Sequence, residues 1–182
     1  IGYIGCNYED SGRLAAGLAA LAGGDDARVC IFSEGGDSPI ESYRERLRGF
    51  CEEVRTRYPA MRILDVRAIG EGQKENETAV RQLFLDFPDV NLIYVINPAD
   101  YGICREIARA DKARQVRIIT NDLVAEQEEL MRAGVISATI CQEPEKQGEL
   151  SLELLFRYLA YGTLPEKKTY YTNLSIHIAQ NS

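Results

Sequence analysis

The sequence has no tryptophan, a single histidine and no long hydrophobic run. A membrane-spanning helix needs about 20 consecutive apolar residues. No segment approaches that length, so we expect no membrane association. The five cysteines form no C-x-x-C pair, and with His177 as the one histidine no zinc site can be assembled. The glycine motifs of nucleotide-binding loops are absent as well, so the sequence predicts no cofactor.

An excess of positive charge is also missing. Lys and Arg number 21 against 28 Asp and Glu, which gives a net charge of −7 and a pI near 4.9. Such a surface repels the phosphate backbone of DNA overall, so this chain alone is a poor nucleic-acid binder. The five arginines between positions 44 and 57 alternate with glutamates, a pattern more typical of a solvated helix face than of a basic patch.

The 182 residues, 45% hydrophobic and 27% charged, have an ordinary globular composition, which excludes disorder and collagen. That length suits one domain or one large lobe, and it is enough to bury a sizeable core. The cysteines are odd in number and have no close pair, so we interpret them as buried apolar residues in a reducing compartment. They are Cys6, Cys30, Cys51, Cys104 and Cys141.

Short apolar segments alternate with helical patterns along the whole chain. The first six are dense in Ile, Val and Leu with almost no alternation, which predicts strands buried on both faces of a parallel sheet. The last segment alternates apolar and polar side chains, as a strand with one solvent-exposed face does. The predicted strands are 2–6, 29–33, 62–66, 92–96, 116–120, 136–141 and 170–178.

The clearest predicted helix begins at Ser38-Pro39-Ile40-Glu41, where the serine can cap, the proline suits the first helical position and the glutamate completes a capping box. Apolar side chains then recur every three or four residues as far as Tyr58. Gly23-Gly24, Gly134 and Gly162 stand where C-terminal caps belong. The other predicted helices are 11–22, 75–87, 100–110, 124–133 and 145–161.

Six strand–helix repeats with short connections predict an α/β fold, a doubly wound parallel sheet with flanking helices and right-handed crossovers. No linker or repeat divides residues 1–182, so we expect one unit. Ligands of such sheets bind outside the carboxyl ends of the strands. The candidate functional side chains are therefore those just after each strand.

That edge is rich in Asn, Asp and Gln, which form several hydrogen bonds to a neutral polyhydroxyl ligand. Asn97, Asp122 and Gln142 each follow a predicted strand. Arg46 lies in the first turns of the helix that begins near Ser38, where its guanidinium can reach over the sheet edge. An ion pair between Arg46 and a neighbouring glutamate is an equally good interpretation from the sequence alone.

Catalysis has weaker support. Asp10 and Asp122 could form an acid–base pair, but nothing in the sequence indicates the unequal environments that such a pair needs. His177 lies on the alternating last strand, and no G-x-S-x-G motif supplies a nucleophile. His177 is better interpreted as a partly exposed strand residue. We therefore expect a binding protein rather than an enzyme, although an enzyme that uses the two aspartates remains an alternative.

Five motifs in order resemble the effector-binding core of LacI/GalR-type transcription regulators, which have the type 1 periplasmic sugar-binding protein fold. The resemblance runs from Ile1 to the end of the chain. Its most specific motif is Gly134-Val-Ile-Ser-Ala-Thr-Ile-Cys-Gln-Glu-Pro144, followed by Gln147-Gly148. The other four motifs are Gly5–Ala16, Arg46-Leu-Arg-Gly-Phe50, Pro88–Asn97 and Ile118–Asp122.

The resemblance implies a sugar or similar small effector in a cleft between two lobes. Its ligand-binding residues would be Arg46, Asn97, Asp122 and Gln142, with Asp10 and Ser42 as additional contacts. It further implies a cytoplasmic, homodimeric regulator, of which residues 1–182 are the C-terminal part of the effector-binding domain. The first lobe and the helix-turn-helix domain that contacts DNA would lie outside this chain. Helix 145–161 would pack on that first lobe, and without the lobe its apolar side chains would form an exposed patch that favours association. These side chains are Leu150, Leu152, Leu154, Leu155 and Tyr158.

Two departures from the family pattern bear on the ligand. Pro98 follows Asn97, where relatives often have Asp, and the loop 68–76 has no aromatic residue to stack on a sugar. A secreted solute-binding protein of a transporter has the same fold and site, and is the alternative hypothesis. The five unpaired cysteines, and a C-terminal segment 173–181 that resembles the end of regulators, favour the regulator.

Overall fold

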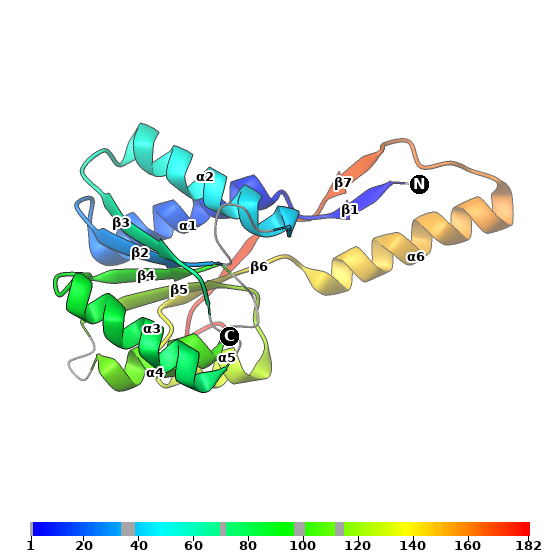
Figure 1. Ribbon diagram of the computed structural model, residues 1–182. Coiled ribbons are helices and arrows are strands. Elements are labelled where there is room, and N and C mark those ends of the chain that lie inside the picture. Colours follow the sequence, from blue (N-terminus) through cyan, green and yellow to red (C-terminus); the bar gives the residue numbers. More distant parts are fainter. Residues whose placement is uncertain (1, 34–38, 70–71, 97–100, 112–114) are drawn as a thin grey trace.

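The computed structural model describes residues 2–33, 39–69, 72–96, 101–111 and 115–182 (Figure 1). The main sheet has six strands in the order β3-β2-β4-β5-β6-β8. All neighbours are parallel except β8, which runs antiparallel to β6. The strands are β2 (Arg28–Phe32), β3 (Arg62–Arg67), β4 (Leu92–Val95), β5 (Arg117–Asn121), β6 (Ala138–Cys141) and β8 (Ser175–His177). This arrangement confirms the predicted α/β fold with a parallel-rich sheet.

Helices cover both faces of the main sheet (Figure 1). The first face carries α1 (Tyr8–Gly23) and α2 (Glu41–Arg57). The second carries α3 (Gln73–Asp86), α4 (Tyr101–Ala110) and α5 (Ala125–Arg132). This double cover explains why apolar side chains do not alternate in the central strands, since β4 is buried along its whole length.

The main sheet separates two hydrophobic cores. On the α1–α2 side, Phe50 stacks on Tyr94 with 5.1 Å between ring centroids. On the opposite side Phe32, Leu83 and Ile107 are fully buried. Each core is closed by the apolar stripes of its helices, as their three- and four-residue spacing requires.

The helix ends agree with the sequence signals in part. α1 begins at Tyr8, earlier than predicted, because the Asn7 side chain caps two backbone N–H groups of the first turn. α2 begins at Glu41, and the predicted cap Ser38 lies outside the described residues. The C-terminal glycines are confirmed, since all three have a positive φ: Gly24 (89°), Gly134 (73°) and Gly162 (68°).

A second, smaller unit projects from the main body (Figure 1). It consists of β1 (Tyr3–Gly5), β7 (Thr169–Tyr171) and α6 (Pro144–Tyr161), and its two strands pair in parallel with each other only. The prediction that the first apolar segment is a buried strand of the main sheet is therefore wrong. Tyr3 in β1 is 40% exposed. Too few covering elements lie around this two-stranded sheet to bury it on both faces.

The predicted single strand 170–178 is also wrong, because it divides into β7 in the small sheet and β8 in the main sheet. The connecting residues cross between the two units, where the Thr172 backbone N–H donates to the Gly5 carbonyl and Leu174 packs on the α1–α2 core. Ile176 in β8 is 38% exposed, so the strand face that was predicted to be covered is only partly covered.

Within the described ranges, no helix is both long enough and apolar enough to cross a membrane.

Candidate ligand-binding site

Three of the predicted ligand residues meet beyond the carboxyl ends of β5 and β6. Arg46 comes from α2, Asp122 follows β5 and Gln142 follows β6. Arg46 Nη2 lies 3.9 Å from Asp122 Oδ2, and Gln142 Nε2 donates to both Asp122 carboxylate oxygens at 2.7 and 2.9 Å. Because β5 and β6 are adjacent and parallel, the residues that follow them lie at one sheet edge.

Arg46 is almost completely buried, with 1% of its surface exposed. It lies one turn before Phe50 on the inward face of α2, and its guanidinium stacks over the Tyr8 ring at 5.0 Å from the centroid. Its Nε and Nη2 atoms have no hydrogen-bond partner within the described part of the chain. Buried polar groups are nearly always paired, so these two donors are candidates for hydrogen bonds to a ligand oxygen.

Among the described residues, no ion pair joins Arg46 to a neighbouring glutamate, the alternative that the sequence left open. The charged partner of Arg46 is Asp122, whereas Glu45 lies 3.9 Å from Arg48. The Arg46–Asp122 separation is too long for a direct hydrogen bond. A ligand hydroxyl can therefore lie between the two, accepting from the guanidinium and donating to the carboxylate.

The position of Arg46 depends on the close approach of α1 and α2. A Cβ at Gly12 would lie 2.0 Å from the Arg46 carbonyl oxygen, and a Cβ at Gly49 would lie 2.1 Å from the Glu9 carbonyl oxygen. Only glycine permits helices to cross at this distance. On the outer side of the crossing, Arg48 pairs with Glu9 at 2.6 Å, and this hydrogen bond lowers the pKa of the Glu9 carboxyl.

The Asp122 backbone is held in the left-handed region, with φ at 59°. Its N–H donates to the Ile140 carbonyl at 2.8 Å, and its own carbonyl accepts from Thr139 Oγ1 at 2.5 Å. Both partners lie in β6, so the end of β5 is tied to its neighbour strand. Aspartate is one of the few residues besides glycine that adopts this conformation at little cost.

Asn121 is buried at the end of β5, next to Asp122, and was not among the predicted ligand residues. Its side chain holds the end of β5 in place through hydrogen bonds to neighbouring elements. Its Nδ2 donates to the Tyr94 hydroxyl at 3.1 Å and to the Ile96 carbonyl at 2.9 Å, and its Oδ1 accepts from Ser11 Oγ at 3.2 Å. The contacts join β4, β5 and α1. Burial raises the pKa of Tyr94 to about 12, so its hydroxyl stays protonated. The sequence did contain a signal for this role, because an asparagine at the end of an apolar strand must find hydrogen-bond partners when it is buried.

The remaining predicted contacts differ in their placement. Asp10 is exposed and pairs with Arg13 at 2.9 Å on its own helix, and among the described hydrogen bonds and ion pairs none joins it to Asp122. The catalytic pairing of Asp10 with Asp122 thus gains no support. Ser42 is half-buried one turn before Arg46 on α2. Asn97 lies outside the described residues. The ligand roles of all six residues stay predictions.

A cavity of about 730 Å³ adjoins Asp122 and Gln142 and extends to the start of α6 and to β8. His177 is one of its lining residues. The His177 Nε2 atom is 3.1 Å from Ser175 Oγ and its Nδ1 atom is 3.2 Å from the Asn181 carbonyl oxygen. Both ring nitrogens are thus engaged within the last strand and the turn that follows it, which agrees with the interpretation of His177 as a strand residue.

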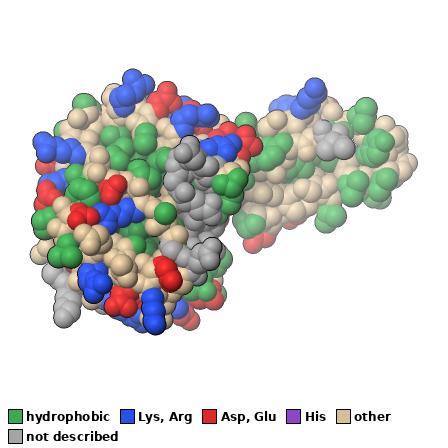
Figure 2. Space-filling model, in the orientation of Figure 1, with side chains coloured by type: hydrophobic (Ala, Val, Ile, Leu, Met, Phe, Trp, Pro, Cys, Tyr) green, Lys and Arg blue, Asp and Glu red, His purple; other side chains and the backbone are tan. Residues whose placement is uncertain are grey.

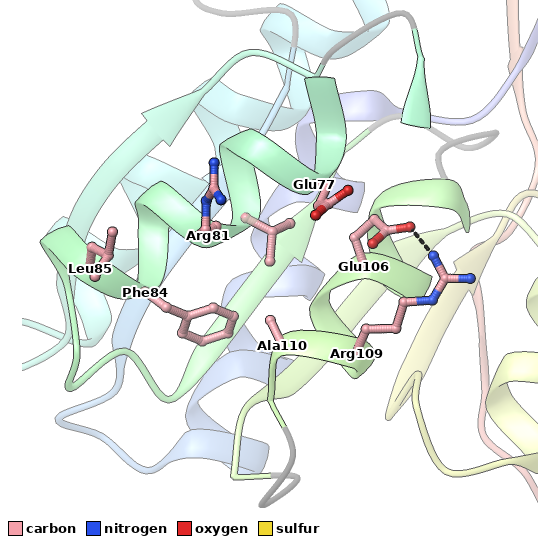
Figure 3. A pocket seen from close by; sticks show the side chains of 8 residues that line it. Glu77, Arg81, Phe84, Leu85, Glu106, Arg109 and Ala110 are labelled. Carbon is pink, nitrogen blue, oxygen red and sulfur yellow. Dashed lines mark hydrogen bonds and ion pairs between the residues drawn. The ribbon is translucent and has the colours of Figure 1, made fainter. Parts of the chain in front are cut away.

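A second groove of about 560 Å³ lies between α3 and α4 (Figure 3). Phe84, Leu85 and Ala110 make much of its wall apolar, and Glu106 pairs with Arg109 at one side. All of its lining residues belong to these two helices, so it is separate from the residues that follow the strands. Across the described ranges, His, Cys, Asp and Glu form no cluster of three or more suited to a metal ion.

Residues 1–163 match the family described as periplasmic binding protein domain. No curated protein matches the chain. Among solved structures, GanP, a glucose-galactose binding protein from Geobacillus stearothermophilus, is 22% identical with a TM-score of 0.86, and AraP, an arabinose binding protein from the same organism, is 23% identical with a TM-score of 0.86. A protein assigned as a LacI transcriptional regulator from Bacteroides fragilis is 23% identical with a TM-score of 0.85.

These three likenesses show the fold. They cover 100%, 99% and 99% of this chain, but only 63%, 63% and 62% of the three structures. The chain thus spans less than two thirds of the length of the proteins that it resembles.

Proposed function

Because this chain belongs to the family of periplasmic binding protein domains, we propose that it binds a neutral sugar, or a similar small polyhydroxyl molecule, and does not transform it. The observation that carries the proposal is the buried Arg46 guanidinium, whose Nε and Nη2 donors lack a partner among the described residues and lie beside the Asp122 carboxylate. Nε–H and Nη2–H occupy one edge of the guanidinium, a geometry that binds two oxygen atoms at once.

The charges of this pair favour a neutral ligand. Arg46 donates, Asp122 accepts, and their opposite charges offset each other across 3.9 Å. Hydroxyl groups both donate and accept, so one hydroxyl can satisfy the two residues together. A site with fixed polar groups rejects a molecule that lacks the matching hydroxyl, since its buried donors would then stay unpaired. Such a site discriminates among sugars without any catalytic group.

The names of the similar structures support a carbohydrate ligand, since GanP binds glucose and galactose and AraP binds arabinose. They name binding proteins and a regulator rather than enzymes. We further propose that residues 1–182 form the C-terminal part of a two-lobed binding domain. Closure of the lobes on the ligand would then stabilise one of two states, a coupling often worth about 1–3 kcal/mol.

Two biological settings fit this proposal. We favour the sensing domain of a cytoplasmic, homodimeric LacI-type regulator that contacts DNA through a separate N-terminal domain, because all five cysteines are free thiols. The second candidate is a secreted solute-binding protein of a transport system, which the two sugar-binding relatives support. The coding frame upstream of the Ile1 codon distinguishes them, because it would encode a helix-turn-helix in the first case and a secretion signal in the second.

Isothermal titration calorimetry with D-glucose, D-galactose, L-arabinose and D-allose tests the binding proposal. We expect at least one of these sugars to bind, and Arg46→Met and Asp122→Asn to abolish the heat of binding without unfolding the chain. Arg105→Met is the matched control, because Arg105 stacks over Tyr101 at 5.2 Å on the opposite helix layer. Unchanged binding in both site variants, or no binding by the unsubstituted chain, would overturn the proposal.

A further inference from the structure

A buried thiol lies directly behind the proposed ligand residues. Cys6, between β1 and α1, is 1% exposed. Its Sγ–H donates to Gln142 Oε1 at 3.2 Å, and Gln142 Nε2 in turn donates to both oxygens of Asp122. The contacts form a chain from Cys6 through Gln142 to the carboxylate that faces Arg46. The sequence patterns suggested no role for Cys6 beyond that of a buried apolar residue.

The two ends of the Gln142 amide have different partners, and both partners specify the same orientation. The carboxylate of Asp122 requires the NH₂ end, and a thiol that donates requires the oxygen end. Cys6 is able to donate because burial raises the pKa of its thiol to about 11, so the proton stays on sulfur throughout the neutral range. In the opposite orientation Gln142 Oε1 would face the Asp122 carboxylate oxygens, and neither would have a proton to share.

The Gln142 backbone is anchored as well. Its carbonyl accepts from Thr172 Oγ1 at 2.8 Å and from Gln147 Nε2 at 2.7 Å. Three segments connect the small unit to the main unit, and Cys6, Gln142 and Thr172 each lie in one of them. Cys6 follows β1, Gln142 precedes α6 and Thr172 follows β7. With the backbone fixed, the remaining freedom of Gln142 is the rotation of its side chain, which the Cys6 hydrogen bond removes.

We propose that Cys6 is a positioning residue of the ligand site, whose thiol fixes the Gln142 amide so that Asp122 is presented beside Arg46. The inference rests on the proposed function, since it concerns the same site. A buried thiol alone would indicate nothing. The independent observation is Arg46, 1% exposed on the other side of Asp122, with two donors that have no partner among the described residues.

The first test needs no ligand. In the ¹⁵N-labelled chain, nuclear magnetic resonance should show the two side-chain amide protons of Gln142 as separate, slowly exchanging signals. Cys6→Ser keeps a donor and should preserve them, whereas Cys6→Ala should broaden them and speed their exchange severalfold. Cys30→Ala, the same change in the opposite core, should leave the Gln142 signals unchanged. Unaltered Gln142 signals in Cys6→Ala would overturn the proposal.

The second test measures coupling by calorimetry with whichever of D-glucose, D-galactose, L-arabinose and D-allose binds. We expect Cys6→Ala to weaken binding roughly three- to tenfold, the range of one hydrogen bond, and Cys6→Ser to restore it to within about twofold. In a Gln142→Ala background, Cys6→Ala should have no further effect, because Cys6 acts through Gln142. If Cys6→Ala weakened binding equally in the unsubstituted chain and in Gln142→Ala, Cys6 would have only a structural role and the proposal would fail. If none of the four sugars binds, the proposed function fails, and the Gln142 signals alone decide the role of Cys6.

Discussion

The six-stranded unit and the small β1–β7–α6 unit bury their apolar side chains in opposite ways. The main unit encloses two cores, one on each face of its sheet. In contrast, α6 has no buried residue, and several hydrophobic groups are exposed on the projecting unit (Figure 2). Leu152, Leu155 and Tyr158, three of the five side chains predicted to form an exposed apolar patch, are exposed, and Leu150 and Leu154 are half-buried. Phe156, Leu159 and Tyr161 of the same helix are exposed too.

This contrast suggests that the main unit provides most of the folding stability, whereas the exposed face of α6 is the surface that favours association. Cooperative folding must come from the main unit, because burial of apolar surface is the dominant favourable contribution. The contacts of α6 include surface ion pairs such as Arg157–Glu153 at 2.6 Å, each worth a few tenths of a kcal/mol. An exposed apolar helix of this size is a surface that favours association. Paired substitutions, one in each unit, test the contrast.

The largest difference is expected between two glycine substitutions. Gly12→Ala in α1 would place a Cβ 2.0 Å from a backbone oxygen of α2, so the helices must separate, and we expect a loss of about 3 kcal/mol or more in the free energy of unfolding. Gly148→Ala in α6 meets nothing within 4 Å and should be neutral or stabilise by up to about 1 kcal/mol. Urea unfolding followed by circular dichroism measures both, and equal losses would contradict the contrast.

Leucine truncations give the next largest difference. Leu83 is fully buried in the core under α3, and Leu83→Ala should cost about 2–5 kcal/mol, through lost transfer energy and the cavity left behind. Leu159 is 73% exposed in α6, and Leu159→Ala should change stability by no more than about 0.5 kcal/mol. The urea midpoints of the two variants provide the comparison. A comparable cost at Leu159 would mean that α6 shares the main cooperative unit.

Alkaline pH should destabilise the main unit. Burial raises the pKa of Cys6 and of Cys141 from 9 to about 11, and that of Cys30 to about 12. The folded chain therefore keeps protons that the unfolded chain releases above about pH 9, and stability falls between there and pH 11–12, by up to about 1.4 kcal/mol per pH unit for each thiol. Urea titrations at pH 8 and 10 test this. Cys30→Ala should flatten the slope, and an unchanged slope would argue against the buried thiol as its cause.

The smallest effect concerns association. Leu159→Glu places a charge on the exposed α6 face and should reduce concentration-dependent association, which sedimentation velocity detects. Leu21→Glu is the matched control, because Leu21 is 85% exposed on α1 of the main unit. It should leave association unchanged. A stronger effect at Leu21 than at Leu159 would place the associating surface on the main unit instead.

The sequence predicted the main sheet well because burial on both faces leaves a strong local signal. The unbroken apolar segment at 92–96 indicated a covered strand, and β4 is one. The first segment, Gly2–Cys6, was predicted to be the same kind of buried strand, yet β1 belongs to another sheet. Strand pairing over more than 160 residues depends on where the chain crosses between units, and composition does not encode that.

The site was predictable in its residue types but not in its internal contacts. Asn, Asp and Gln after parallel strands pointed to one edge, where Asp122 and Gln142 do meet. The burial of Arg46 follows from the approach of α1 to α2, which requires glycines on two separate helices. The link from Cys6 to Gln142 joins residues 136 positions apart. Such pairings arise from tertiary packing, which local sequence patterns do not predict.

The backbone conformation of Asp122 restricts how this recognition surface can be altered, by selection or by design. At φ 59° glycine, asparagine and aspartate fit at the lowest cost, so few substitutions are favourable at position 122. Glycine would remove the acceptor, and asparagine would exchange one carboxylate oxygen for a donor. A library intended to change the proposed ligand specificity should therefore keep Asp122 and diversify the half-buried Ser42, because its helical backbone accepts most residues.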